Sequence, residues 1–349
     1  MPLRPDLVER LLFLQTQQAP GPLLDLLGGL AFKAVVAAVR LGLFEALHDG
    51  PADPDELSRR TGASARGLRF LCDALEPLGY LERDGARYRN STLAEKWMLA
   101  SAEAPLSDLF AYFDDMTARW DHLDEAVRVG RPAVDIVAWN GEREGRWRRY
   151  HAGMRAIARL LAPEVVARVD VPAGAKRLLD LGGSHGLFAA RFCRRYPSLS
   201  AVVLDGPAAR EVALETIAAE GMEGRVEYRS GDALTDDLGQ GWDVALLFNV
   251  ARALPREPLA ALLRRIAGAL TDGGRLVILD QLEERPSTPL RRANARLIEL
   301  ELFAASPGDL HRAEDLTLWI AEAGFAPPRR IALKRAGGQQ LLVAEKARR

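Results

Sequence analysis

The sequence predicts an α/β fold joined to a mainly helical N-terminal domain, and two patterns support this prediction. From about residue 171 onward, short apolar runs alternate with helical stretches, as in a parallel sheet that helices cover on both faces. Before residue 100, two helices separated by a turn lead into a β-hairpin, which is the order of elements in a winged helix. With 349 residues, the chain is long enough for two modest domains.

The N-terminal domain is predicted over residues 1–100. Apolar side chains recur at helical spacing over Leu30–Leu47. A second helix is expected to start at residues 53–56, where acidic side chains stand in the first turn. The helix after the turn at 61–64 carries a leucine stripe that we expect in the core or at a dimer seam: Leu68, Leu71, Leu75 and Leu78. The pair Asp84-Gly85 then predicts the turn of the hairpin.

The rest of the chain divides into a connector and a sheet domain. Residues 101–170 are helical in pattern and rich in aromatic side chains. We predict a connector that lines a ligand cavity, with most of its aromatic side chains in the core. Residues 171–349 hold the sheet, whose strand candidates are 177–181, 201–204, 226–228, 244–248, 275–279, 331–333 and 341–344. Because Gly337-Gly338 separates the last two apolar runs, an antiparallel hairpin is expected to finish the sheet.

Composition argues against several classes of function. Lys and Arg total 47 and Asp and Glu total 48, so the basic excess of a nucleic-acid or acidic-membrane binder is missing. Cys72 and Cys193 are the only cysteines, too few for a disulfide framework or a thiolate metal site. No histidine pair has metal-ligand spacing, so no metal is predicted. The sequence has neither a signal-peptide core nor an apolar run near the ~20 residues of a membrane span, which predicts a cytoplasmic protein.

The most informative segment is a glycine loop that follows a buried strand. The strand holds Asp180 near its end, and Gly182, Gly183 and Gly186 follow before the next helix. Glycines at this position let the backbone approach a ligand and place helix N–H groups beside it. The spacing is not that of a dinucleotide loop or a Walker loop. An acid before the glycines suits a ligand with an ammonium group better than one with a pyrophosphate.

Two more acids stand at the ends of the next two predicted strands. Asp205, followed by Gly206, ends one strand, and Asp232 follows the other. An acid at the end of the second strand can accept both hydrogen bonds of a ribose diol. Each acid taken singly fits a helix cap, but with Asp180 the three line one crevice of an open sheet. Together they fit an adenosine with an amino-acid tail and a positive sulfur.

At this point the sequence resembles the class I S-adenosylmethionine-dependent small-molecule O-methyltransferases that carry an N-terminal winged-helix dimerisation domain. The resemblance covers about residues 25–345 and rests on motifs in the family's order: Asp180-Leu181-Gly182-Gly183-Ser184-His185-Gly186, Val203-Leu204-Asp205-Gly206-Pro207, Gly231-Asp232, Trp242-Asp243, Gly273-Gly274 and Ala323-Gly324-Phe325. It implies a Rossmann-like methyltransferase sheet, a homodimer formed through the N-terminal domain, and an aromatic or polyketide-like methyl acceptor.

The resemblance also implies a role for individual residues around S-adenosylmethionine. By carry-over, Gly182 meets the methionine part and Asp205 the ribose, while Phe248 covers the other side of the cofactor. The adenine falls to Asp232 and Ala233. Met154 stands where the family often places a methionine near the sulfonium.

One departure from the family concerns the catalytic base. Members that methylate a hydroxyl usually have a histidine nine residues after the aspartate that opens the fourth strand, and this histidine takes the substrate proton. Nine residues after Asp243 stands Arg252. An arginine stays protonated near neutral pH and cannot act as an ordinary base.

Several interpretations of Arg252 stay open. The substrate can ionise without help, with Arg252 holding a phenolate or carboxylate, so that positioning and charge stabilisation drive the transfer. Another residue can be the base, and the candidates are His151, Glu283 and His311. The scaffold can also serve C- or N-methylation or a non-methylating reaction. In a purely structural role, Arg252 would cap a helix or pair with Glu257.

A DNA-binding regulator is the rival from another class, because winged helices often read a major groove. Residues 1–100 hold 12 basic and 13 acidic side chains. The candidate recognition helix has Arg66 and Arg69 but also Asp73 and Glu76. Since phosphate contacts need a basic surface, we expect this domain to pair two chains and to bind no nucleic acid.

Overall fold

The computed structural model describes residues 6–16, 18–282, 288–306, 308, 310–334 and 339–347. The chain folds as two compact units, Met1–Met116 and Thr117–Arg349. The boundary falls inside one helix, α7 (Ser107–Arg119). The division of the sequence at residues 100 and 170 stays a prediction, and each unit is described below by itself.

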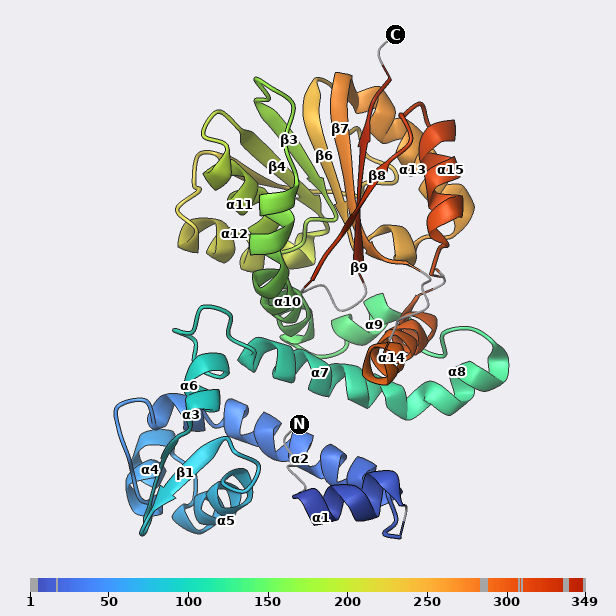
Figure 1. The fold of residues 1–349 in the computed structure, drawn as a ribbon. Helices are drawn as coiled ribbons and strands as arrows, with labels where there is room; N and C mark the ends of the chain where they lie inside the picture. The colour runs from blue at the N-terminus through green and yellow to red at the C-terminus, as the bar shows by residue number, and fades with distance from the viewer. Residues whose placement is uncertain are drawn as a thin grey trace. The chain divides into compact units, whose positions relative to one another are not determined.

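The first unit is helical with one small hairpin (Figure 1). Before α7 its elements are α1 (Leu7–Arg10), η1 (Leu11–Gln15), α2 (Pro22–Arg40), α3 (Leu43–Ala46), α4 (Pro54–Thr61), α5 (Ala65–Leu75), β1 (Leu81–Asp84), β2 (Arg87–Asn90) and α6 (Thr92–Trp97). The hairpin at Asp84-Gly85 is confirmed, with Asp84 opposite Arg87. The long helix expected up to Leu47 ends early instead, because Gly42 adopts a left-handed φ of 64° and starts α3.

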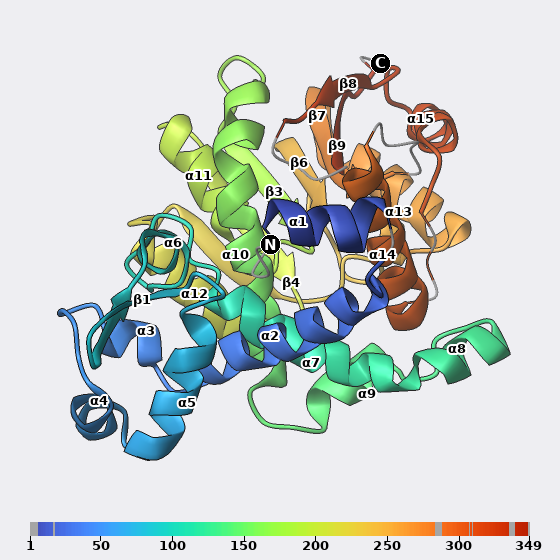
Figure 2. The same cartoon turned by 60° about the horizontal axis from the view of Figure 1, so that its bottom comes forward.

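The leucine stripe of α5 lies in the core of this unit, as one of the two expectations had it. Leu68 and Leu75 are buried, and Leu71 and Leu78 pack against the same cluster. Figure 2 shows α3, α4 and α5 grouped at one end of α2. Many apolar side chains of α1, η1 and the first half of α2 are exposed instead. Seven leucines there are each at least 46% exposed: Leu7, Leu11, Leu14, Leu23, Leu26, Leu27 and Leu30.

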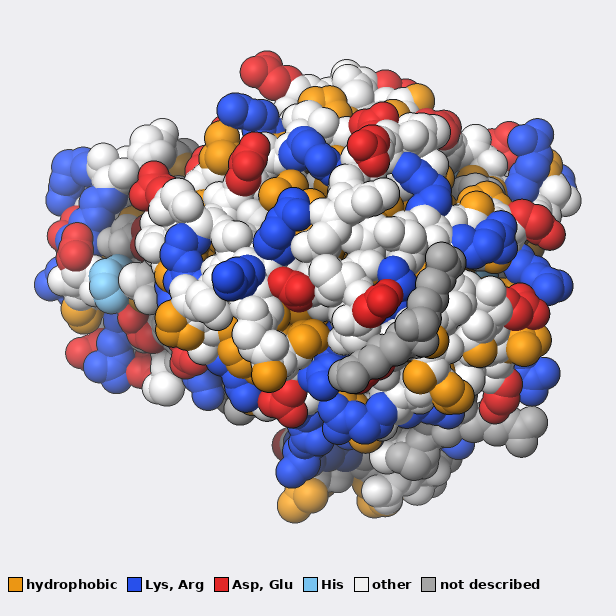
Figure 3. Space-filling model, turned by 90° about the horizontal axis from the view of Figure 1, so that it is seen from above, with side chains coloured by type: hydrophobic (Ala, Val, Ile, Leu, Met, Phe, Trp, Pro, Cys, Tyr) orange, Lys and Arg blue, Asp and Glu red, His pale blue; other side chains and the backbone are white. Residues whose placement is uncertain are grey.

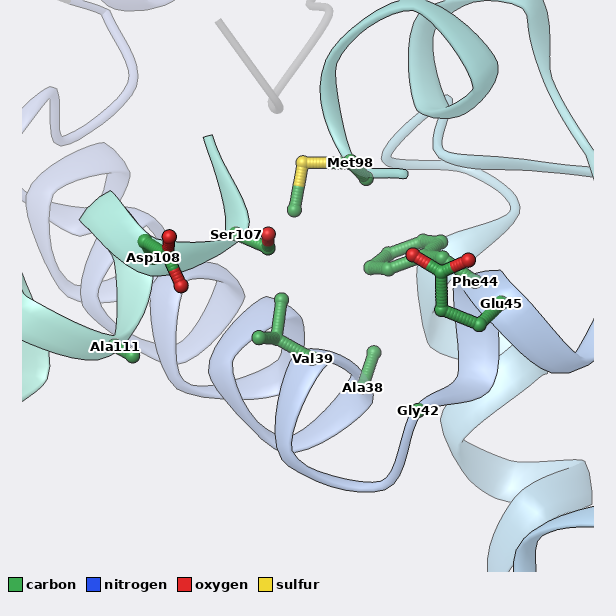
Figure 4. A pocket seen from close by; sticks show the side chains of 9 residues that line it. All are labelled: Ala38, Val39, Gly42, Phe44, Glu45, Met98, Ser107, Asp108 and Ala111. Carbon is green, nitrogen blue, oxygen red and sulfur yellow. The ribbon is translucent and has the colours of Figure 1, made fainter. Parts of the chain in front are cut away.

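A cavity of about 220 Å³ lies within the first unit. Figure 4 shows the side chains that line it, which come from α2, α3, Met98 and the start of α7. Glu45 lies at this cavity, and its Oε1 accepts the backbone N–H of Ala100 at 2.7 Å. None of the site residues predicted from the sequence lines this cavity.

The second unit contains the predicted sheet. Its seven strands run in the order β5-β4-β3-β6-β7-β9-β8. They are β3 (Arg177–Leu181), β4 (Ser200–Asp205), β5 (Val226–Ser230), β6 (Trp242–Phe248), β7 (Leu270–Gln281), β8 (Arg329–Ala332) and β9 (Gln339–Glu345). The first five are parallel, and β9 pairs antiparallel with both β7 and β8. This confirms the parallel sheet and its antiparallel end, although Gly337-Gly338 lies outside the described residues.

Helices cover both faces of this sheet (Figure 1). Leu178 of β3 belongs to a core with α10 (Arg146–Arg168), α11 (Leu187–Arg195) and α12 (Arg210–Ala219). Its neighbour Leu179 belongs to the opposite core, with α13 (Arg256–Ala269) and α15 (Ala313–Glu322). The alternation follows from the two-residue period of a strand. The other helices of this unit are η2 (Trp120–His122), α8 (Leu123–Val129), α9 (Ile136–Gly141), η3 (Pro207–Ala209), η4 (Ala251–Ala253) and α14 (Pro289–Ala305).

Acidic and basic side chains are intermixed over most of the face in Figure 3. Within the described ranges, no helix is both long and apolar enough to cross a bilayer. No group of three potential metal ligands occurs in that same part of the chain.

Candidate functional site

The glycine loop of residues 182–186 joins β3 to α11 by a chain of left-handed residues. The φ angles are 65° at Gly182, 47° at Ser184 and 69° at Gly186. A Cβ on Gly182 would lie 2.5 Å from Cγ2 of Val250, which follows β6. Only glycine therefore fits at 182, both for its backbone angle and for its close approach to the neighbouring strand end.

Asp180 lies beneath this loop and is 1% exposed. Neither of its carboxylate oxygens accepts a hydrogen bond of good geometry, although the backbone N–H of Ala189 is near enough to lower its pKa slightly. A Cβ on Gly183 would lie 2.5 Å from Cγ of Asp180, so the loop backbone rests directly on the carboxyl group. Burial, with repulsion from Asp205 as a smaller cause, raises the pKa of Asp180 to about 7. A ligand cation near the loop would favour the ionised carboxylate.

Asp205 ends β4 and orders the glycine loop from the side. Its Oδ2 accepts the backbone N–H of Ser184 at 2.7 Å, and its Oδ1 accepts that of Gly206 at 2.6 Å. Burial raises the pKa of Asp205, and these two hydrogen bonds oppose the rise. Each oxygen keeps a lone pair for a further donor, as recognition of a ribose diol requires.

Asp232 follows β5 next to this position, because Asp205 and Ser230 are opposite each other in the sheet. Asp232 is exposed, and its Oδ1 accepts the backbone N–H of Leu234 at 2.8 Å. The following Ala233 is half-buried. The structure thus brings the three acids to the carboxyl ends of three adjacent strands, with exposure increasing from Asp180 to Asp232.

Phe248 lies on β6 and Met154 on α10. Phe248 is the last residue of β6, and its buried ring meets Phe188 edge-on at 4.8 Å between centroids. Met154 is half-buried on α10. Both lie in the unit that holds the glycine loop, and their roles beside the cofactor stay a prediction.

Arg252 lies in the turn η4 after β6, where a buried carboxylate holds it. Its backbone N–H donates to Oδ2 of Asp280 at 3.1 Å, and its Nε lies 3.6 Å from Oδ1. The pairing of Arg252 with Glu257 that we considered is therefore wrong. Asp280 is 1% exposed, and burial raises its pKa while Arg252 opposes the rise. The buried carboxylate lies nearer to the guanidinium than exposed Glu257 does, so it takes the pair.

His151 is buried on α10 and contacts the glycine loop. Its Nδ1 lies 2.7 Å from Oγ of Ser184, and its Nε2 has no hydrogen-bond partner. The ring stacks on Trp147 at 5.6 Å and meets Tyr150 edge-on at 5.0 Å. Burial lowers the pKa of His151 to about 4, so the ring is neutral near pH 7.

Tyr150 is a half-buried residue of α10, next to His151 in the chain. Burial raises the pKa of its hydroxyl; Arg252 and Arg119 lower it, and Asp205 and Glu301 raise it. The charged groups that influence this pKa come from β4, η4, α7 and α14. Arg119 is itself buried and forms an ion pair with Glu301. A second cation–anion pair near the site is formed by Arg252 and Asp280.

The remaining candidate bases from the sequence are His311 and Glu283. Nε2 of His311 lies 3.0 Å from the carbonyl oxygen of Ala251 and 3.1 Å from that of Leu254. That nitrogen donates a proton to hold the η4 turn and does not receive one. Glu283 lies outside the described residues.

Three residues at the site were not found from the sequence. Asp280 ends a strand, so the rule that selected the other three acids would also have selected it. Tyr150 stands four residues before Met154, on one helix face. Ser184 lies inside the glycine motif, and only its left-handed backbone and its contact with His151 distinguish it.

Comparison with known protein families matches almost the whole chain. A model of the O-methyltransferase domain matches residues 120–326, and a model of the O-methyltransferase dimerisation domain matches residues 24–100. One relative is the 3-hydroxy-5-methyl-1-naphthoate 3-O-methyltransferase of Streptomyces sahachiroi, 30% identical over 94% of this chain and 96% of the relative. Another is the N,N-dimethyltransferase OxyT of Streptomyces rimosus, 32% identical over 90% of this chain and 92% of the relative.

Solved structures show the same fold. The structure of human N-acetylserotonin methyltransferase in complex with SAM superposes with a TM-score of 0.81, over 96% of this chain and 99% of that one. The two sequences are 23% identical, so this likeness concerns the fold. It agrees with the class I methyltransferase sheet expected from the sequence.

Proposed function

The chain belongs to the O-methyltransferase family, and on that basis we propose that it transfers the methyl group of S-adenosylmethionine to a hydroxyl of a small aromatic or polyketide-like molecule. The observation that carries the proposal is the meeting of the glycine loop, Asp205 and Arg252 at the carboxyl ends of adjacent parallel strands. Ligands of open α/β sheets bind at that edge.

The residues at this edge suit S-adenosylmethionine. Its positive sulfur and ammonium group match the unpartnered carboxylate of Asp180 below the loop. Gly182, Gly183 and Gly186 would hold the methionine part, and Asp205 with Gly206 the ribose. Asp232, Ala233, Phe248 and Met154 complete the expected cofactor residues. When bound, the cofactor supplies an electrophilic methyl group on sulfur.

Arg252 would stabilise the acceptor as an anion. Asp280 holds its backbone and its guanidinium, so the cation is oriented before the acceptor arrives. A preformed positive charge lowers the free energy of a phenolate more than that of a phenol. We therefore expect acceptors whose hydroxyl ionises near neutral pH, such as phenols activated by a neighbouring carbonyl group. The relative from Streptomyces sahachiroi methylates, by its name, the hydroxyl of an aromatic carboxylate.

Transfer to nitrogen is the second candidate. It is favoured by the relative named as an N,N-dimethyltransferase, whose identity to this chain is as high as that of the naphthoate enzyme. A neutral amine needs no base before attack, which also agrees with an arginine at position 252. The DNA-binding regulator is disfavoured by the family match over residues 24–100.

The first unit would form a homodimer. Its match to the dimerisation domain covers α2 to α6, and the exposed leucines of α1, η1 and α2 form the apolar face that such an interface needs. A cytoplasmic location remains a prediction from the sequence.

Labelled cofactor tests the proposal directly. The enzyme is incubated with methyl-labelled S-adenosylmethionine and a panel of hydroxyaromatic acids, hydroxyquinones and aromatic amines. Product mass and NMR then locate the label. Label on oxygen supports the main proposal, label on nitrogen supports the second candidate, and conversion of a substrate without label contradicts both.

A further inference from the structure

We propose that His151 is a positioning residue that fastens α10 to the cofactor loop through Ser184, so that cofactor binding orders the helix face that meets the acceptor. The inference rests on the proposed function, since it takes S-adenosylmethionine as the ligand of the loop. It gives His151 a different role from the catalytic base that the sequence suggested.

Ser184 is held from two directions in a conformation that its side chain alone would not favour. Its φ of 47° is in the left-handed region, which residues with a Cβ rarely adopt. Its backbone N–H donates to Asp205 at 2.7 Å, and its Oγ lies 2.7 Å from Nδ1 of His151. The same residue therefore connects Asp205, which would bind the ribose, to α10. A shift of the loop has to move His151 or break this hydrogen bond.

On the α10 side of this hydrogen bond, His151 is tightly packed. His151 is 4% exposed, stacked on Trp147 and packed edge-on against Tyr150. Trp147 and Met154 lie four residues before and three residues after His151, on the same face of α10. The ring of Tyr150 contacts that of His151, and both Asp205 and Arg252 influence the pKa of its hydroxyl. A shift of the loop would therefore act on α10 through His151 and its aromatic neighbours.

The geometry argues against His151 as the base. Its Nδ1 is occupied by Ser184, and its Nε2 is enclosed, with no accessible surface and no partner. A base has to reach the acceptor hydroxyl within hydrogen-bond distance. Neither ring nitrogen is therefore open to a ligand. The contact with Ser184 and the enclosed Nε2 both agree with a buried residue that joins α10 to the loop.

Calorimetric titration with S-adenosylhomocysteine separates the two roles. Ser184→Ala and His151→Ala each remove one partner of the hydrogen bond, and each should weaken binding about tenfold, as expected for one buried hydrogen bond. The double variant should bind no more weakly than either single variant, because the two changes break the same contact. His151→Asn can replace Nδ1 as a partner and should restore most of the affinity, although asparagine cannot accept a proton as a base.

Hydrogen exchange measures the coupling itself. Saturating S-adenosylhomocysteine should slow exchange in both the loop and residues 147–155 of the wild type. In Ser184→Ala the loop should stay protected while the protection of 147–155 is lost. Ser198→Ala removes a hydroxyl hydrogen bond, to the carbonyl oxygen of Ala175 at 3.1 Å, from a remote part of the same unit and is the control. It should change neither measurement.

Each outcome has one meaning. If the wild type gives no heat with S-adenosylhomocysteine, the proposed function fails. If the wild type binds but Ser184→Ala leaves both affinity and α10 protection unchanged, the tether is refuted and the proposed function stands. Equal loss of turnover in His151→Ala and His151→Asn with unchanged affinity would instead make His151 the base.

Discussion

Asp280 holds Arg252 at two points. One carboxylate oxygen accepts the backbone N–H of Arg252 at 3.1 Å, and the other lies 3.6 Å from its guanidinium. The carboxylate is 1% exposed, while the arginine side chain keeps 17% exposure. The buried carboxylate thus fixes the position of a partly exposed positive group.

Replacing Arg252 with alanine should lower kcat about 100-fold, which is typical when one preorganised group that stabilises developing charge is lost. Binding of S-adenosylhomocysteine should change little, because the proposed role of Arg252 is to hold the acceptor and not the cofactor. Steady-state kinetics and calorimetry measure the two effects. Arg264→Ala, on the exposed face of α13, is the control and should keep wild-type kcat. An unchanged kcat in Arg252→Ala would show that Arg252 does not stabilise charge during the transfer.

At saturating S-adenosylmethionine, which would keep Asp180 ionised, the pH dependence of kcat/KM for the acceptor should follow the acceptor and not the enzyme. With Arg252 in place of a base, the reactive species is the ionised hydroxyl, so activity rises with pH and levels off above the pKa of the acceptor. Two active phenols of different acidity should give inflections that differ as their own pKa values do. A common inflection for both phenols would show that an enzyme group titrates instead.

Asp180→Asn should stabilise the free protein at alkaline pH. Burial raises the folded-state pKa of Asp180 from 3.8 to about 7, so the folded chain holds a proton that the unfolded chain has released between these values. The stability of the wild type is therefore complete below about pH 4 and falls as pH rises through 7. By pH 8 the asparagine variant should gain a few kcal/mol relative to wild type, because a tenfold change in proton affinity corresponds to about 1.4 kcal/mol. Urea unfolding at pH 5 and pH 8 checks this, and an equal difference at both values would contradict it.

Gly182→Ala should weaken cofactor binding by more than the strain of a left-handed backbone angle alone would cause. A Cβ there meets Val250 at 2.5 Å, whereas Gly224 has a similar φ of 78° and no atom within 4 Å. Gly224→Ala should thus cost only about 1 kcal/mol of stability and keep the affinity for S-adenosylhomocysteine. Gly182→Ala should weaken that affinity more than tenfold, about 1.4 kcal/mol, and adding Val250→Ala should recover part of it. Equal effects of the two glycine variants would show that the contact with Val250 is unimportant.

Charges on the exposed leucine face should separate the subunits. Leu26 and Leu30 are 66% and 70% exposed on α2, so replacing both with glutamate leaves the core intact but opposes burial in an interface. Light scattering after size exclusion should show monomers with native circular dichroism. Leu318→Glu, at 53% exposure on α15, is the matched control and should remain a dimer. If the double variant is still a dimer, the interface lies on another surface of the protein.

Local patterns predicted the elements well, because they depend on neighbours in the chain. The alternation of apolar runs predicted all seven strands of the main sheet, and Asp84-Gly85 predicted the hairpin turn. The helix expected over Leu30–Leu47 ended at Arg40, since a left-handed glycine interrupts an apolar pattern that continues past it. Periodicity reports which face is buried and does not report where the backbone turns.

Partners in space were harder to predict than elements. Glu257 was considered for Arg252 because it is close in sequence, whereas the buried carboxylate of Asp280 stands 28 residues away and on the adjacent strand. The contact of His151 with Ser184 spans 33 residues and joins a helix to a loop. A single sequence contains no signal that pairs residues so far apart in the chain.

The sequence by itself determined the order of strands and helices, the glycine loop and the acids at the strand ends, because these follow from local backbone preference and from the shared edge of parallel strands. Only the tertiary structure decided which charged and polar groups meet. Burial and distance set those pairings, and both arise from the packing of segments that the chain keeps far apart.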